Sequence, residues 1–182
     1  MPALNPDHLL DQADRLVAPP ARGAARQADL RRAISNAYYA VFHAVVTEAA
    51  DRFAGRSRSQ RQGPLYRTIY RGIEHNRLRK LCDEFANSKG KDKDKLSDQM
   101  KRCLEYAPRG AFGPEWEDWA RSVAGLYQKR MEADYDPKLR VSPSDAVLAV
   151  RLARTAVAQF RAADGATRNA FVALLVFPPT AR

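Results

Sequence analysis

The fold of this chain is decided by one stretch in its first quarter, Arg31-Arg32-Ala33-Ile34-Ser35-Asn36-Ala37-Tyr38-Tyr39-Ala40-Val41-Phe42-His43-Ala44. Its apolar residues recur three and four positions apart, which is the spacing of one face of an α-helix. No Gly or Pro occurs from Ala24 to Ala54, so the predicted helix is long. Ser35, Tyr39 and His43 follow one another at intervals of four and share one edge of it. We expect this helix at the centre of the fold, where its neighbours supply hydrogen-bond partners for this structural polar cluster.

Further helices are predicted on both sides. One runs from Asp7 to Val17, behind a capping Asn5. After a basic loop at 56–63, Pro64 opens a helix that runs to about Asn87. The inner residues of that helix are predicted to be Leu65, Ile69, Ile73, Leu81 and Phe85. The remaining helices are predicted at 96–106 after a solvated loop at 88–95, at 115–133, at 144–163 behind a capping Ser142, and at 168–177. No alternating pattern exceeds four residues, so we expect an all-α bundle of about six helices.

The composition indicates one globular domain with an anionic partner. The chain has 182 residues, of which 45% are apolar, and this suits a single domain that spans 1–182. Its net charge of +10 favours nucleic acid as the partner, and the alternative is a basic but idle surface.

The same composition argues against several other classes of protein. The two cysteines, Cys82 and Cys103, have neither a zinc-ligand spacing nor a nearby His cluster, so we expect no metal and no disulfide framework. No apolar run approaches the length of a membrane span, and the N-terminus lacks the pattern of a signal peptide. We therefore expect a cytoplasmic protein that needs no cofactor and has no contact with a membrane.

The densest positive stretch is the basic segment, residues 52–80. It contains nine basic residues and one acidic residue, Glu74. If one helix runs through it, Arg67, Arg71, His75 and Arg79 form a stripe on one face, with Arg77 beside it. This set is the predicted nucleic-acid-binding surface. The alternative interpretation is that these basic residues form the solvated face of the helix, opposite its apolar face, and bind no ligand.

A second candidate site lies near the end of the 115–133 helix. Arg130 and Asp134 are one turn apart, and Tyr135 follows them. Together with His43 or Tyr39 they could form a catalytic group, in which Arg130 holds a phosphate and a Tyr or His moves a proton. The preferred interpretation is a buried polar clasp between two helices.

Trp116, Trp119 and Tyr127 are interpreted as core residues rather than as stacking platforms for bases.

Two motifs together resemble a known family. The stretch Ile34 to Ala44 resembles the Ser-x-Ala-Tyr-Tyr-Ala-x-Phe-His signature of prokaryotic HEPN domains, in their uncharacterised HEPN-like branch. Arg130 to Pro137 resembles the Arg-x-x-Ala-Asp-Tyr-Asp-Pro element of that branch. The resemblance implies an antiparallel up-down four-helix bundle with additional short helices, commonly a homodimer. Many such domains are metal-independent endoribonucleases and act as toxins paired with a small nucleotidyltransferase antitoxin.

This chain departs from the family's ribonuclease motif, which is an Arg followed after four to six residues by a His. No His follows Arg130 within reach, and only three residues separate Arg71 from His75. The leading hypothesis is therefore a degenerate HEPN-like protein that binds RNA or nucleotide in a toxin–antitoxin or defence context. The first alternative is an active endoribonuclease that uses Arg130, Asp134 or Tyr135, and His43. The second alternative is a non-catalytic protein-interaction scaffold.

Overall fold

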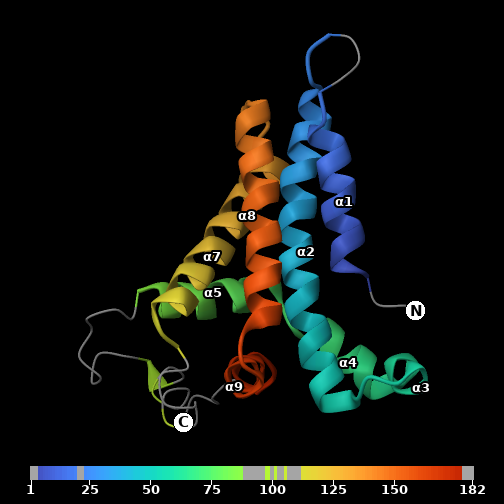
Figure 1. Cartoon of the computed structure of the whole chain (residues 1–182), viewed down its shortest axis with the longest axis vertical. Helices are drawn as coiled ribbons and strands as arrows, with labels where there is room; N and C mark the ends of the chain where they lie inside the picture. The colour runs from blue at the N-terminus through green and yellow to red at the C-terminus, as the bar shows by residue number, and fades with distance from the viewer. Residues whose placement is uncertain are drawn as a thin grey trace.

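The structure is a computed structural model that describes residues 4–19, 23–87, 97–98, 101, 105 and 112–177. All regular structure in these ranges is helical. The helices in these ranges, labelled in Figure 1, are α1 (Pro6–Val17), α2 (Gln27–Ala54), α3 (Arg58–Gln62), α4 (Pro64–Gly72), α5 (His75–Ala86), α7 (Pro114–Tyr135), α8 (Pro143–Ala162) and α9 (Gly165–Val176). The predicted all-α class is confirmed.

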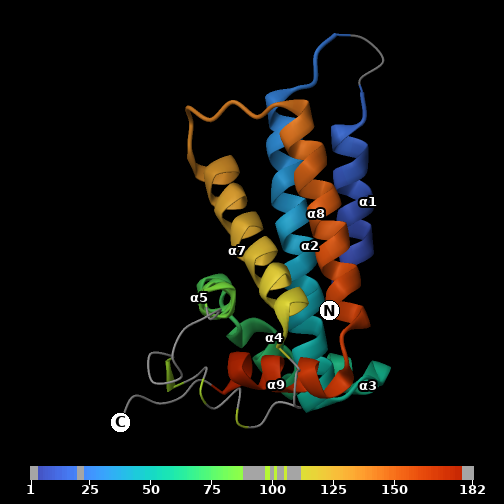
Figure 2. The ribbon, with the colours of Figure 1, turned by 60° about the vertical axis from the view of Figure 1, so that its left-hand side comes forward.

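The long helix α2 is the centre of the molecule. It contacts α1, α7 and α8 along its length, and α3, α4 and α9 near its C-terminal end. Figures 1 and 2 show that α1 and α7 run in one direction while α2 and α8 run in the other. Sixteen of its side chains are buried and they lie on all sides of the helix, because neighbours surround it. It begins at Gln27, three residues later than predicted, and ends at Ala54 as predicted. Gly55 caps it with a φ of 96°, which suits only glycine.

The ends of the other long helices follow from capping residues. Asn5 Oδ1 accepts a hydrogen bond from the Asp7 amide at 3.0 Å, and the Ser142 hydroxyl accepts one from the Asp145 amide at 3.1 Å. Pro6, Pro114 and Pro143 each occupy the first turn of a helix, where a missing N–H costs nothing. The predicted α1, α7 and α8 are confirmed to within a few residues.

The segment after α2 differs from its prediction in two places. Residues 58–62 form α3 rather than a loop, because Ser57 and Gln60 make a reciprocal capping box. The single helix predicted from Pro64 to Asn87 is wrong, since it breaks after Gly72 into α4 and α5. Leu65 is 57% exposed, and Tyr66 at 3% takes the inner position instead.

The lower end of the bundle is closed by α4, α5 and α9 (Figure 2). The rings of Trp116, Trp119 and Phe171 pack there with centroids 4.7–5.2 Å apart, and the indole of Trp119 donates to the Ala156 carbonyl at 3.0 Å. The two tryptophans are therefore core residues, as predicted, while Tyr127 is only half-buried.

The predicted loop at 88–95 and most of the predicted helix at 96–106 lie outside the described residues, as does Cys103. Cys82 is fully buried, and this burial raises the pKa of its thiol. Among the helices that the structure describes, none has the length and apolar character needed to cross a membrane.

Candidate functional site

The two motifs meet in a polar cluster that we call the α2–α7 clasp, formed by Ser35, Tyr39, Arg130 and Asp134. Arg130 donates from Nη2 to the Tyr39 hydroxyl at 2.7 Å, and its Nε forms an ion pair with Asp134 Oδ2 at 2.8 Å. The Ser35 hydroxyl donates to Asp134 Oδ1. The four side chains therefore tie the middle of α2 to the last turns of α7.

The guanidinium of Arg130 is enclosed by protein groups. Its remaining nitrogen, Nη1, lies 3.0 Å from the sulfur of Met131, and its Cζ lies 5.3 Å from the ring centroids of both Tyr39 and Tyr135. Burial opposes its charge, but the Tyr39 hydroxyl and the Asp134 carboxylate outweigh burial and raise its pKa. Arg130 is 9% exposed, whereas Tyr135 is 66% exposed and covers it from outside. The guanidinium is thus occupied on its edges and its faces.

Two histidines extend this cluster toward α4 and α5. His43 Nδ1 lies 2.7 Å from the Tyr70 hydroxyl, and His75 Nδ1 lies 3.1 Å from the Tyr38 hydroxyl. Burial, with a smaller contribution from the charge of His75, lowers the pKa of His43 to about 4. Burial, followed by the positive charge of Arg130, also lowers the pKa of His75. Both imidazoles are therefore neutral near pH 7.

His75 is not on the basic stripe on which the sequence pattern placed it. The break after Gly72 makes it the first residue of α5 and turns its ring against α2. Its centroid lies 3.9 Å from that of Phe42 and 5.4 Å from that of Tyr39. An isolated Gly inside a helical pattern is the one sequence signal that could have indicated this break.

Two side chains that the sequence interpretation missed fix the far end of α7. Arg31 donates to the carbonyls of Asp136 at 2.6 Å and Leu139 at 2.7 Å. Gln27 donates to the Val141 carbonyl at 2.8 Å and accepts from the Val141 amide at 2.9 Å. These contacts join residues more than a hundred positions apart, so no local pattern could have shown them.

The predicted nucleic-acid-binding residues have separate surroundings. Arg67 and Arg71 are exposed on α4. Arg77 donates to the Leu174 carbonyl of α9 at 2.9 Å, and Arg79 is paired with Asp83 and bonded to Asn76 at 3.1 Å. A continuous stripe on one helix is therefore wrong, because Arg77 and Arg79 lie on a different helix from Arg67 and Arg71 and both have partners.

Acids outside the basic segment neutralise part of it. Arg52 and Arg56 pair with Glu48 at 2.7 and 3.2 Å, and Arg61 forms a two-point pair with Asp51 at 2.6 and 2.9 Å. Four exposed cations of the segment form no ion pair with any residue that the structure describes: Arg58, Arg67, Arg71 and Lys80.

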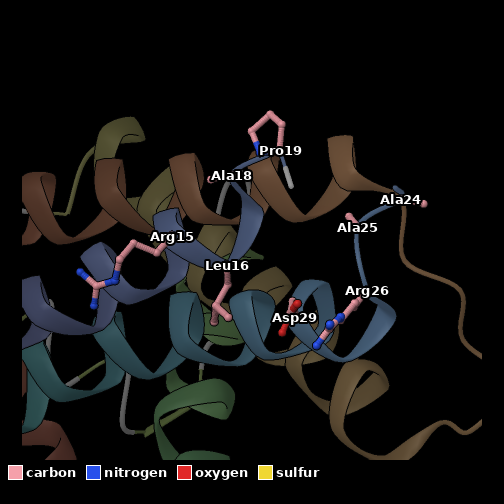
Figure 3. A pocket seen from close by; sticks show the side chains of 8 residues that line it. All are labelled: Arg15, Leu16, Ala18, Pro19, Ala24, Ala25, Arg26 and Asp29. Carbon is pink, nitrogen blue, oxygen red and sulfur yellow. The ribbon is translucent and has the colours of Figure 1, made fainter. Parts of the chain in front are cut away.

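A hollow of about 400 Å³ lies between the end of α1 and the start of α2 (Figure 3). Arg15, Arg26 and Asp29 line it together with apolar residues, and no residue of the α2–α7 clasp takes part.

Within the described ranges, no three His, Cys, Asp or Glu side chains gather in a way that could hold a metal ion.

Comparison with known proteins finds no family model, no curated protein and no solved structure that matches the chain.

Proposed function

We propose that this chain is a HEPN-like helical bundle that binds RNA or nucleotide without cleaving it. The resemblance of its two motifs to the HEPN-like branch supports the family. The contacts of Ser35 and Tyr39 on α2 with Arg130 and Asp134 on α7 fit a pair of motifs that belong to one structural unit.

The observation that carries RNA binding is the set of unpaired cations on α3, α4 and α5. Arg67 and Arg71 are one turn apart on α4, and Arg58 and Lys80 lie on the helices that flank it in sequence. The chain as a whole has a net charge of +10. When cations without acidic partners bind the phosphates of a nucleic acid, they displace the counterions condensed on its backbone, and this release is a large source of the affinity.

The absence of cleavage is inferred from the α2–α7 clasp and the two histidines. Phosphoryl transfer needs a guanidinium free to reach a phosphate and a proton carrier free to reach the attacking oxygen. Arg130 is enclosed by Tyr39, Asp134 and Tyr135, and Nδ1 of each imidazole is bonded to a tyrosine. These groups are best suited to holding the helices in register.

Binding is tested by titrating labelled single-stranded RNA with the protein at several salt concentrations. We expect the Arg67→Glu/Arg71→Glu double variant to lose affinity at least tenfold. The matched control, Arg140→Glu/Arg151→Glu, makes the same charge change at two other exposed positions and should lose much less. Failure of the wild type to bind at moderate salt would instead favour the scaffold.

An active metal-independent endoribonuclease is the second candidate, and one observation favours it. The start of α5 brings His75 beside Tyr39 and near Arg130, which supplies the imidazole that is missing downstream of Arg130. Incubation with mixed RNA in excess EDTA separates the two candidates. Cleavage that is lost in both Arg130→Ala and His75→Gln, and retained in His8→Gln on the exposed face of α1, would establish the nuclease.

The oligomeric state and the partner are proposed from the resemblance alone. We propose a homodimer that acts with a small nucleotidyltransferase. Sedimentation of the pure protein should give twice the 20.4 kDa chain mass, and a single-chain mass across a range of concentrations would contradict the dimer.

A further inference from the structure

α2 ends at the lower end of the bundle, near α3, α4 and α9 (Figures 1 and 2). Four arginines gather there around two carboxylates. Glu48 is approached by Arg52 at 2.7 Å, by Arg56 at 3.2 Å and by Arg168 of α9 at 4.0 Å. Asp51 is paired with Arg61 at 2.6 Å and lies 3.9 Å from Arg56. Arg168 comes from a helix more than a hundred residues further along the chain.

The positive charges in this group exceed the negative ones. The four arginines face Glu48 and Asp51, which leaves an excess of two positive charges. Asp164 also faces Arg168, but the backbone N–H groups of Ala166 and Thr167 and the Thr167 hydroxyl already occupy its carboxylate. With Asp164 counted, at least one positive charge remains unbalanced.

Two of the arginines, Arg52 and Arg168, are held in place before any ligand arrives. Arg168 donates from Nη1 to the Arg161 carbonyl at 2.9 Å, and Arg52 donates from Nε to Glu48 at 2.7 Å. Nη2 of Arg52 reaches the start of α9, 3.8 Å from where a Cβ on Gly165 would lie. A carboxylate that fixes one edge of a guanidinium leaves its other edge available for a second anion.

One donor in the group has no acceptor. Nε of Arg168 is buried and makes no hydrogen bond to any part of the chain that the structure describes, and its side chain is only 20% exposed. A buried donor on a charged group costs free energy unless an acceptor satisfies it. Arg56, in contrast, is 59% exposed. Its Nη2 donates to both Glu48 oxygens at 3.2 and 3.4 Å, its Nε lies 3.9 Å from Asp51, and its Nη1 makes none of these contacts.

We propose that a phosphate group binds to the arginine cluster formed by Arg52, Arg56 and Arg168. Its oxygens accept hydrogen bonds from guanidinium edges that Glu48 leaves open, and its charge balances the positive excess. As a site for an RNA phosphate, the cluster rests on the proposed function. It then adds a contact on the α2 and α9 side of the basic surface to those of Arg67 and Arg71.

The phosphate site is tested first without RNA. The thermal unfolding of the full chain is measured in inorganic phosphate and in sodium chloride at equal ionic strength. Phosphate should raise Tm in the wild type and in the control Arg151→Gln, and it should have no such effect in Arg56→Gln or Arg168→Gln. An equal rise in all four proteins would overturn the proposal. Since Arg56 is largely exposed, Arg56→Gln remains informative even if Arg168→Gln fails to fold.

The second arm measures affinity for single-stranded RNA in the same proteins. Arg56→Gln and Arg168→Gln should weaken binding about tenfold and reduce the log–log salt slope by roughly 0.7 for one lost phosphate contact. If RNA binds and depends on Arg67 and Arg71 but not on Arg56 or Arg168, the arginine cluster is not an RNA site while the proposed function stands. If phosphate binds at the cluster but RNA does not bind, the RNA-binding part of the proposed function fails, while the arginine cluster stands as a site for a free phosphate compound such as a nucleotide.

Discussion

Arg130 is the side chain on which the contact between α2 and α7 depends most. Its guanidinium donates to Tyr39 on α2 and pairs with Asp134 one turn further along α7. Replacing it with Ala leaves the Asp134 carboxylate without its cation and the Tyr39 hydroxyl without its donor. We expect Arg130→Ala to lower the free energy of unfolding by about 3 kcal/mol.

Urea unfolding of this variant beside Arg151→Ala provides the check. Arg151 is exposed on α8, and its loss should change stability by no more than about 0.5 kcal/mol. If the free energy of unfolding falls by the same amount in the two variants, Arg130 does not hold α2 and α7 together.

The buried imidazole of His43 makes stability depend on pH. Its pKa is about 4 in the folded chain, against an ordinary value of 6.5 when unfolded. Between these values the unfolded state binds more protons, so stability falls as the pH falls from about 6.5 toward 4. Since the ring is partly exposed and screened by solvent, we expect a loss of only about 1–2 kcal/mol.

Denaturant unfolding at several pH values tests this contribution. His43→Gln should flatten the profile in that window, although His75, whose pKa is also lowered, keeps part of the slope. Gln159→Ala, at an exposed position of α8 that does not titrate, should leave the profile unchanged. An unchanged profile in His43→Gln would show that this imidazole titrates normally in the folded chain.

At the scale of a residue, the sequence showed which side chains carry polar groups, but it did not show which neighbouring helix supplies the hydrogen-bond partner of each group. The spacing of Ser35, Tyr39 and His43 predicted one shared edge, and Ser35 and Tyr39 do face α7. His43 instead faces Tyr70 of α4, because α7 slants away from α2 toward the lower end of the bundle (Figure 1). A partner on another helix is a property of the packing, which one helix does not determine.

The end of α2 depends on Gly55. Its φ of 96° is unfavourable for any side chain, and a Cβ there would collide with the side chain of Gln60, which caps α3. We expect Gly55→Ala to cost about 1–2 kcal/mol. Gly125→Ala is the matched control, since Gly125 lies inside α7 with open space around it and should gain up to about 1 kcal/mol. Equal effects of the two substitutions on the unfolding midpoint would contradict the assigned role of Gly55.

The connection between α7 and α8 is held by Gln27. Its two hydrogen bonds satisfy both the N–H and the C=O of Val141. In Gln27→Ala we expect the Val141 amide to exchange with solvent at least about tenfold faster. Hydrogen exchange read by NMR provides the measurement, and Gln128→Ala on α7 serves as the control. Unchanged protection of Val141 would mean that Gln27 does not anchor this connection.

At the scale of an element, helix ends marked by strong capping residues were predictable and the end without such a mark was not. Asn5, Gly55 and Ser142 each indicated a boundary that the structure has. The break after Gly72 has no proline, and the residue before α5, Glu74, makes no side-chain cap. That missed break also misplaced His75, whereas Ile73, Leu81 and Phe85 are buried as predicted. Leu65 lies before the break, in the first turn of α4, and is exposed.

At the scale of the whole molecule, charge is distributed unevenly between paired and unpaired cations. The net charge and the density of the basic segment were visible in the sequence. Which cations are neutralised was not visible, because Glu48 and Asp51 lie on α2, before the segment, and Asp83 lies after it. Arg58, Arg67, Arg71 and Lys80 are the cations of that surface that pair with no acid in the part of the chain that the structure describes.

The most direct test of RNA binding is the affinity of the full chain for single-stranded RNA as a function of salt. If about four phosphates are neutralised, a plot of log affinity against log salt should have a slope of about −3, and Arg67→Glu/Arg71→Glu should make it shallower. Binding that is independent of salt, or that is unaffected by this double reversal, would contradict the account.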